Sequence, residues 1–179
     1  GLPITNKVES WDGTNWSEIS EVNAAITQTV VAGTATAGLK YSGALPSNTG
    51  NTELWDNSSW TEVADLNTAR NGASGAGTQT AALCFNGVGP PSLTKNESWN
   101  GSTWTEITGT NTARVDGGGC GTQIAALSMG GEAATELVNT ETWDGTTWTE
   151  VNNMATAGWG FGSNGSNTSA IITNRFSPL

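Results

Sequence analysis

The sequence predicts an all-β protein built from one repeated unit. Tryptophan pairs recur at a fixed interval of 44 residues, and turn-forming residues separate segments only long enough for short strands. A helical fold is disfavoured, because no segment carries apolar residues at helical spacing over three turns, and glycine runs such as residues 117–119 would destabilise a helix. The pairs are Trp11 and Trp16, Trp55 and Trp60, Trp99 and Trp104, and Trp143 and Trp148.

Each repeat is predicted to contain four short strands. In the second copy we expect them over residues 70–77, 79–85, 95–99 and 104–107. The two tryptophan-bearing strands are joined by turns such as residues 12–15, whose Asp12-Gly13 step accepts the positive φ that a hairpin turn requires. The unit is therefore a small antiparallel sheet.

Such sheets cannot bury both of their faces alone, so neighbouring sheets must stack on one another. Stacked around an axis, they form a β-propeller. The strand nearest the axis must tolerate crowding, which suits the small residues at 72–77 and 116–121. The tryptophans then fill the wider gaps between the outer parts of the blades, where their large apolar rings stabilise the packing.

The two ends of the chain carry complementary halves of a repeat. Residues 1–23 supply two tryptophan strands, whereas residues 156–176 supply two small-residue strands. We therefore predict one domain over residues 1–179, a four-bladed propeller in which N- and C-terminal strands share the last blade and leave no exposed edge. The alternative is a four-repeat segment of a larger propeller. The predicted blades are residues 24–67, 68–111, 112–155, and 156–179 together with 1–23.

Composition disfavours several classes of function. The chain has 16 acidic and 6 basic residues and a net charge of −10, so it lacks the basic stripe that binding to duplex nucleic acid requires. It has no apolar stretch long enough to span a membrane and no visible signal peptide. The acidic residues are dispersed, which is typical of a solvated surface.

The two cysteines do not form a repeated ligand pair. Cys84 and Cys120 are 36 residues apart and so occupy different phases of the repeat, and the chain contains no histidine. We expect two buried free thiols, no metal site and no cofactor.

The repeat resembles the kelch repeat. It has a double glycine after an apolar strand in residues 129–131, an aromatic-Asp step at Trp143-Asp144, a tryptophan at Trp148, and loop arginines at Arg70 and Arg114. The resemblance covers essentially the whole chain and implies a propeller. Departures occur where the double glycine becomes Ser42-Gly43 or Asn86-Gly87 or is lost at Asn174-Arg175, and where Ile26 and Gly158 replace the arginine.

More narrowly, residues 77–83 and 97–106 look like the kelch-like arrays of virion and tail-fibre proteins of marine bacteriophages. This resemblance implies a location in the virion, with a secreted or extracellular protein as the alternative. The partners it implies are other virion proteins or cell-surface glycans, and a homo-oligomer is compatible with it.

Residues present in every repeat are interpreted as structural. The repeated tryptophans could stack on sugars, but packing between blades is the simpler role. The repeated glutamates could be read as acids or calcium ligands, yet their phase equivalence favours pairing with the loop arginines or with backbone N–H groups. This structural set comprises the eight paired tryptophans together with Glu9, Glu53, Glu97, Glu141, Arg70 and Arg114.

Ligand contacts are instead expected where the repeat is broken. Trp159 is the one tryptophan outside the periodic set, so it is a candidate ligand contact or a plug of the central channel. The variable loops 44–51, 88–96 and 132–139 could carry specificity on a rigid frame. Pro90 and Pro91 stiffen the second of these loops, which also contains Lys95.

These observations favour a non-enzymatic structural and adhesive module that presents loops to proteins or to host surfaces. The alternative is a free carbohydrate-binding lectin. An enzyme is the weakest hypothesis, because no nucleophile with a base and no unrepeated carboxylate pair is visible.

Overall fold

The computed structural model describes residues 4–89 and 94–173 of the chain. Within these residues the regular elements are sixteen β-strands, all paired in antiparallel fashion, with no helix. The all-β prediction is therefore confirmed.

Three sheets contain four strands each, hydrogen bonded in chain order. The first comprises β3 (Val30–Thr34), β4 (Ala37–Tyr41), β5 (Thr52–Trp55) and β6 (Trp60–Glu62). The second comprises β7 (Ser74–Thr78), β8 (Ala81–Phe85), β9 (Asn96–Trp99) and β10 (Trp104–Ile107). The third comprises β11 (Gly118–Thr122), β12 (Ala125–Met129), β13 (Thr140–Trp143) and β14 (Trp148–Val151).

The two ends of the described chain form separate hairpins. One is β1 (Val8–Trp11) with β2 (Trp16–Ile19), and the other is β15 (Gly162–Gly165) with β16 (Ala170–Thr173).

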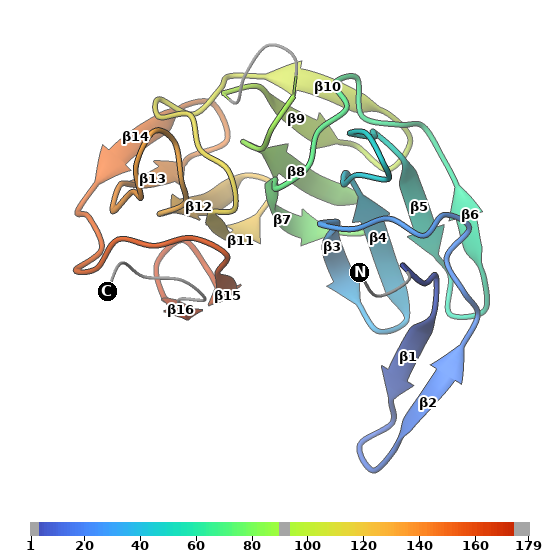
Figure 1. The fold of residues 1–179 in the computed structure, drawn as a ribbon. Helices are drawn as coiled ribbons and strands as arrows, with labels where there is room; N and C mark the ends of the chain where they lie inside the picture. The colour runs from blue at the N-terminus through green and yellow to red at the C-terminus, as the bar shows by residue number, and fades with distance from the viewer. Residues whose placement is uncertain (1–3, 90–93, 174–179) are drawn as a thin grey trace.

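The sheets are arranged as successive sectors around an open centre (Figure 1). The first strands of neighbouring sheets contact one another, β3 with β7, β7 with β11, and β11 with β15. The last strand of each four-stranded sheet lies on the outside of the arc. This arrangement is that of a β-propeller-like fold, although the arc is not closed.

Aromatic side chains pack between successive sheets. The Trp104 ring of the second sheet lies 4.9 Å from the Tyr41 ring of the first, and the Trp148 ring of the third lies 5.0 Å from the Phe85 ring of the second. All four rings are buried. The core therefore lies between sheets, as expected for sheets too small to bury their own faces.

Two glycines permit this close packing. A Cβ atom at Gly75 would lie 2.2 Å from Tyr41 Oη, and one at Gly119 would lie 2.8 Å from Phe85 Cζ. Any side chain at these positions would have to displace the aromatic ring of the preceding sheet. The small residues of the first strands thus make room for the neighbouring blade.

Three strands of the second repeat begin later than predicted. Strand β8 begins at Ala81 instead of 79 and β9 at Asn96 instead of 95, and the difference is largest for β7. The sequence predicted a strand over residues 70–77, but β7 begins at Ser74. Gly72 has a φ of 58°, which interrupts an extended backbone. The preceding residues Arg70 and Asn71 form only isolated bridges, with Thr49 and Val88 respectively.

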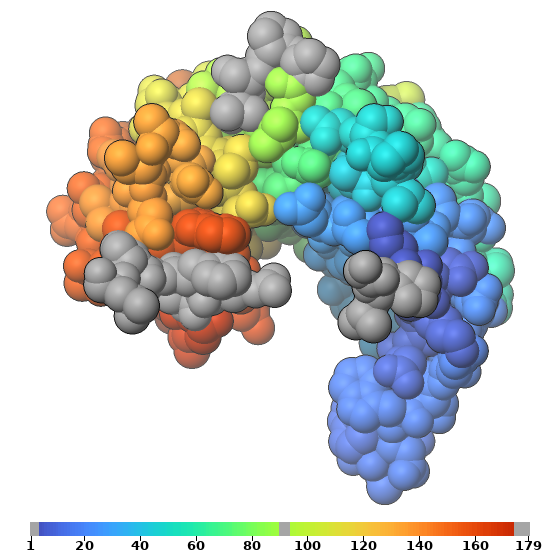
Figure 2. Space-filling view, viewed as in Figure 1, coloured from blue at the N-terminus to red at the C-terminus, as the bar shows by residue number. Residues whose placement is uncertain are grey.

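The predicted sharing of a fourth sheet by the two ends is not present. Hairpins β1–β2 and β15–β16 form two separate two-stranded sheets. The N-terminal hairpin projects from the body, with open space between it and the C-terminal hairpin in the view of Figure 2. Within the described residues, the edge of β1 that faces away from β2 has no strand partner.

Candidate functional site

Four residues at equivalent positions of the repeat lie two residues before the first strand of each sheet, β3, β7, β11 and β15. Gln28, Gly72, Asp116 and Gly160 are each 44 residues apart and have φ values of 55°, 58°, 51° and 68°. The amide of Asp116 donates to the carbonyl of Gly72, and the amide of Gly160 donates to the carbonyl of Asp116, both at 2.8 Å. The repeats are therefore linked here through their main chains.

A cavity of about 210 Å³ lies at this junction, and we call it the axial pocket. Its bulky walls are Trp159 and Phe161, and Asp116 contributes a carboxylate. A Cβ at Gly72 would lie 2.7 Å from Oδ1 of Asp116, so the absence of a side chain at Gly72 leaves room for that carboxylate. The axial pocket is lined by Gln28, Thr29, Gly72, Ala73, Asp116, Gly117, Trp159, Gly160 and Phe161.

The aromatic wall of the axial pocket is supported from behind. A Cβ at Gly130 would lie 2.5 Å from Phe161 Cε2 and 2.6 Å from Met154 Cε, so both side chains press on this glycine. Trp159 is half-buried and follows directly after the buried Gly158. Two aromatic side chains beside a carboxylate and backbone groups suit a small polar ligand with one apolar face.

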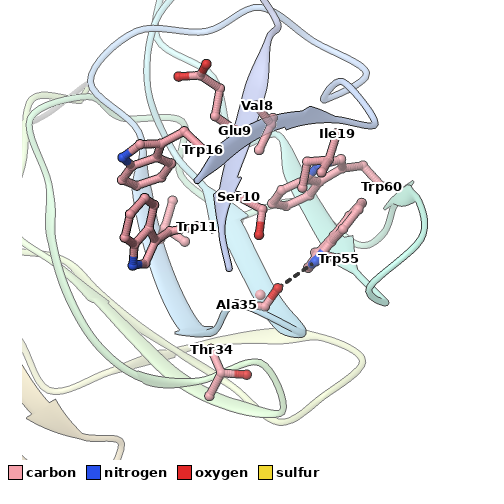
Figure 3. Close-up of a pocket in the computed structure, with 12 residues that line it drawn as sticks. Val8, Glu9, Ser10, Trp11, Trp16, Ile19, Thr34, Ala35, Trp55 and Trp60 are labelled. Atoms are coloured by element: carbon pink, nitrogen blue, oxygen red, sulfur yellow. Dashed lines mark hydrogen bonds between the residues drawn. The ribbon is translucent and has the colours of Figure 1, made fainter. Parts of the chain in front are cut away.

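A second hollow, of about 390 Å³, lies between hairpin β1–β2 and the first sheet (Figure 3). We call it the tryptophan groove. Its lining is mainly apolar and includes both members of two tryptophan pairs. The groove is lined by Val8, Glu9, Ser10, Trp11, Trp16, Ile19, Val31, Thr34, Ala35, Gly38, Trp55 and Trp60.

The repeated tryptophans fall into two environments. Trp55, Trp99, Trp104, Trp143 and Trp148 are buried, and Trp60 is half-buried. By contrast, the side chains of Trp11 and Trp16 are 49% and 65% exposed. Their rings still pack on each other at 5.6 Å, close to the 5.4 Å of the third-sheet pair. The pairing of two tryptophans is therefore local, whereas their burial requires a neighbouring sheet.

The repeated glutamates of the three full sheets are buried in ion pairs. Glu97 pairs with Arg70 and Glu141 with Arg114, both at 2.7 Å. Burial lowers the pKa of the Arg114 guanidinium, while its contact with Glu141 opposes that shift. These groups hold the loop that enters each sheet against its third strand, which is a structural task.

Sequence reasoning missed the cation of the first sheet. Ile26 stands where the loop arginine would be, and Lys40 of β4 instead places its Nζ 2.8 Å from Oε1 of Glu53. Lys40 is itself buried. The available signal was a lysine inside an otherwise apolar strand, at a position where the later repeats carry Cys84 and Ser128.

The variable loop of the second repeat is described only in part. Pro90 and Pro91 lie outside the described residues. Lys95 forms an exposed ion pair with Glu106 at 2.8 Å, and its carbonyl accepts a hydrogen bond from Arg70. Lys95 lines neither the axial pocket nor the tryptophan groove.

The cysteines are free and buried, as predicted. Burial raises the pKa of the Cys84 thiol to about 12, so this group stays protonated at neutral pH. Burial also raises the pKa of Cys120. Within residues 4–89 and 94–173, no cluster of three or more acidic, histidine or cysteine side chains is arranged to hold a metal ion.

Two comparisons bear on the identity of the chain. No protein-family model matches it, and no curated protein matches its sequence. Among the described residues, the structure contains no helix suited to crossing a membrane.

Proposed function

We propose that this protein is a non-enzymatic structural and adhesive module of the β-propeller type, which binds its partner through the axial pocket. The observation that carries the proposal is the position of Trp159. Trp159 is the single tryptophan outside the repeat. Together with Phe161 and Asp116, it lines the cavity where the segments leading into the first strands of successive repeats meet. Unrepeated residues on a repeated frame are where recognition is expected.

The chemistry of the axial pocket favours a carbohydrate or a small polar loop of a protein. An indole ring can stack on the apolar face of a sugar, and a carboxylate can accept hydrogen bonds from its hydroxyl groups. The net charge of −10 argues against nucleic acid as the partner. The frame around the pocket is held by main-chain bonds between repeats, so little ordering is needed on binding.

The location we propose is a phage virion or tail fibre, because the repeats resemble the kelch-like arrays of virion and tail-fibre proteins. In this setting the module presents its loops and axial pocket to other virion proteins or to glycans of the host surface. Two completions of the open arc are compatible with this function: four blades, by pairing β1 with β16, or a larger propeller with additional blades, which the inference below favours.

The alternative function is a free carbohydrate-binding lectin. The tryptophan groove favours it specifically, because Trp11 and Trp16 are exposed and could themselves stack on sugar rings. The two functions therefore predict different sites for a bound glycan.

A glycan array and a binding panel of purified phage tail proteins test both functions with the same three chains. These are the unmodified chain, Trp159→Ala and Trp16→Ala. Trp16 is the matched control, since it is an exposed tryptophan outside the axial pocket. We expect binding to at least one tail protein or glycan to fall by about tenfold or more in Trp159→Ala and to persist in Trp16→Ala.

Each other outcome is informative. Selective glycan binding that is lost in Trp16→Ala but kept in Trp159→Ala supports the lectin and rejects the axial pocket. Binding that survives both substitutions places the contact elsewhere and contradicts the proposed site. Circular dichroism of both variants establishes that any loss is not due to unfolding.

A further inference from the structure

One edge of β1 has no strand partner, whereas the equivalent edges of β5, β9 and β13 are paired. In the three full sheets the third strand pairs with the second strand on one side and with the fourth on the other. Strand β1 corresponds to these third strands, yet among the described residues it pairs only with β2. Its free edge therefore exposes backbone donors and acceptors that can receive another strand.

The repeat specifies the register of that missing strand. In the third sheet Ala126 lies opposite Trp143, and Ser128 lies opposite Glu141. Trp11 and Glu9 occupy the same phase as Trp143 and Glu141. A strand added to β1 would thus place its second-strand residues opposite Trp11 and Glu9 in the same way.

In the full sheets, the hairpin formed by the first two strands also provides a hydrogen-bond acceptor for the indole N–H of the tryptophan on the third strand. The Nε1 of Trp143 donates to the carbonyl of Gln123, in the turn between the first and second strands of its sheet, at 3.0 Å. Trp99 donates to Gln79 in the second sheet at 2.9 Å. In the described structure no covering turn is present at Trp11, whose indole is half exposed. A hairpin on this edge would supply the acceptor as well as the apolar cover.

Charge makes the requirement more specific. Glu53, Glu97 and Glu141 are fully buried, and each is paired with a cation. Glu141, for example, also accepts the backbone amides of Asn111 and Thr112 at 2.7 and 3.0 Å. Glu9 is exposed, and no hydrogen bond joins its carboxylate to any residue in the described part of the chain.

The chain's own C-terminal hairpin does not provide a cation at either position used in the full sheets. The arginines come from the loop before the first strand, where the equivalent residue is Gly158. The lysine comes from the second strand, where the equivalent residue is Ile172. Pairing β16 with β1 would therefore bring Glu9 no cation from either of these two positions. The C-terminal hairpin of a second copy of the chain would place the same glycine and isoleucine at these two positions.

We propose that the edge of β1 accepts a β-hairpin of the same repeat type that carries a loop arginine for Glu9, supplied from outside residues 1–179. The hairpin pairs with β1 in the register described above, covers Trp11 and Trp16, and buries the carboxylate of Glu9 against its arginine. This inference does not depend on the axial pocket, so it can fail or succeed independently of the proposed function.

A steric feature further defines the partner. Val31 stands where the later sheets carry Gly75 and Gly119, the glycines that make room for an aromatic ring of the preceding sheet. Val31 is 65% exposed in this structure. The incoming second strand must therefore end in a residue smaller than tyrosine or phenylalanine, a condition that Thr173 at the end of β16 also meets.

The test uses the full chain and a synthetic hairpin as the probe. The probe copies residues 110–131, with Cys120→Ala to match the alanines at positions 32 and 76, and Met129→Thr to fit beside Val31. The control peptide carries Arg114→Gly in addition. Binding is measured by calorimetry and by the blue shift of tryptophan fluorescence that burial of Trp11 and Trp16 would produce. Glu9→Gln and Glu18→Gln chains are compared, because Glu18 is exposed on the neighbouring strand and paired with Lys7.

We expect the arginine peptide to bind at least about tenfold more tightly than the control peptide. Glu9→Gln should abolish this preference and Glu18→Gln should retain it. The proposal is overturned if the two peptides bind equally, if the preference survives in Glu9→Gln, or if neither peptide binds. Tighter binding of a peptide copying residues 154–173 would also overturn it, in favour of closure by the C-terminal hairpin.

Discussion

The first and last tryptophan hairpins of the chain have nearly the same sequence but different surroundings. Residues 9–13 read Glu-Ser-Trp-Asp-Gly, and residues 141–145 read Glu-Thr-Trp-Asp-Gly. Both hairpins pair the same positions, Trp11 with Trp16 and Trp143 with Trp148. Yet Trp11 is 49% exposed and Trp143 only 3%. Local sequence determines the hairpin, whereas burial depends on the sheet that covers it.

The glutamates of the two hairpins show the same difference. Glu141 is buried with Arg114 and two backbone amides, but Glu9 is exposed. The carboxylate chemistry is identical, so its consequences depend on whether neighbouring strands remove water. A carboxylate in water needs no partner, whereas a buried one does.

The largest contrast should appear when equivalent tryptophans are removed. Trp104 is buried against Tyr41, and its Nε1 donates to Thr52 Oγ1 at 3.2 Å. We expect Trp104→Ala to lower the free energy of unfolding by about 3–5 kcal/mol. Trp16→Ala, at the same phase but exposed, should change it by less than about 0.5 kcal/mol. Urea denaturation measures both, and equal losses would contradict the view that Trp16 is uncovered.

A smaller contrast is expected at the positions that face the preceding sheet. A Cβ at Gly119 would lie 2.8 Å from Phe85 Cζ and 2.9 Å from the carbonyl oxygen of Gly75. Gly119→Ala should therefore destabilise the protein by about 1–3 kcal/mol through overpacking. Val31→Ala, at the equivalent exposed position, should be almost neutral. Thermal unfolding of the two variants checks this, and a neutral Gly119→Ala would show that the sheets pack less closely than described.

The smallest effects are expected in the turns, and the effect should be larger at Asp144, whose carboxylate also accepts the hydroxyl groups of Thr146 and Thr147. Oδ1 of Asp144 accepts the amides of Thr146 and Thr147, and that of Asp12 accepts the amides of Thr14 and Asn15. These bonds hold the pKa of both carboxyls below the ordinary value of about 3.9. Each turn thus contributes stability that is complete above that pH and is lost as the pH falls through the folded-state pKa.

Asparagine substitution tests the turns, because Asn100 already forms the same two bonds in the second repeat. Asp144→Asn and Asp12→Asn should each lower the melting temperature slightly at about pH 7 and by less at about pH 2.5, because these carboxyls are already protonated in the unfolded state at the lower pH. Melting curves at both pH values provide the measurement. The reverse change, Asn100→Asp, should raise stability more at the higher pH than at the lower one. A loss at Asp12 as large as that at Asp144 would contradict a contribution from the extra hydroxyl bonds at Asp144.

Much of the fold could be predicted because the same pattern of strand and turn residues occurs in each repeat. The second strand of the tryptophan hairpin at 104–107 is found with the predicted bounds, since its turn and its tryptophan specify it locally. The start of β7 could not be predicted, because the left-handed conformation of Gly72 depends on its contact with the next repeat, where it lies under Asp116. The ion pair of Lys40 was missed for the same kind of reason, since a lysine of the second strand takes the place of an arginine from the loop before the first strand.

The axial pocket illustrates the same limit. The break in the repeat marked Trp159 as unusual, but nothing in the spacing placed Phe161 and Asp116 beside it. These residues come together only where successive first strands meet. Recognition residues on a repeated frame can be found by their irregularity, while their partners require the packing of sheets.

By itself the sequence determined the strands, the turns and the pairing of tryptophans, because these depend on residues within about ten positions of one another. Only the tertiary structure decided which tryptophans and glutamates are buried and which remain exposed. Burial requires surface from a neighbouring sheet, and the same local sequence forms a core where that sheet is present and an open edge where it is absent.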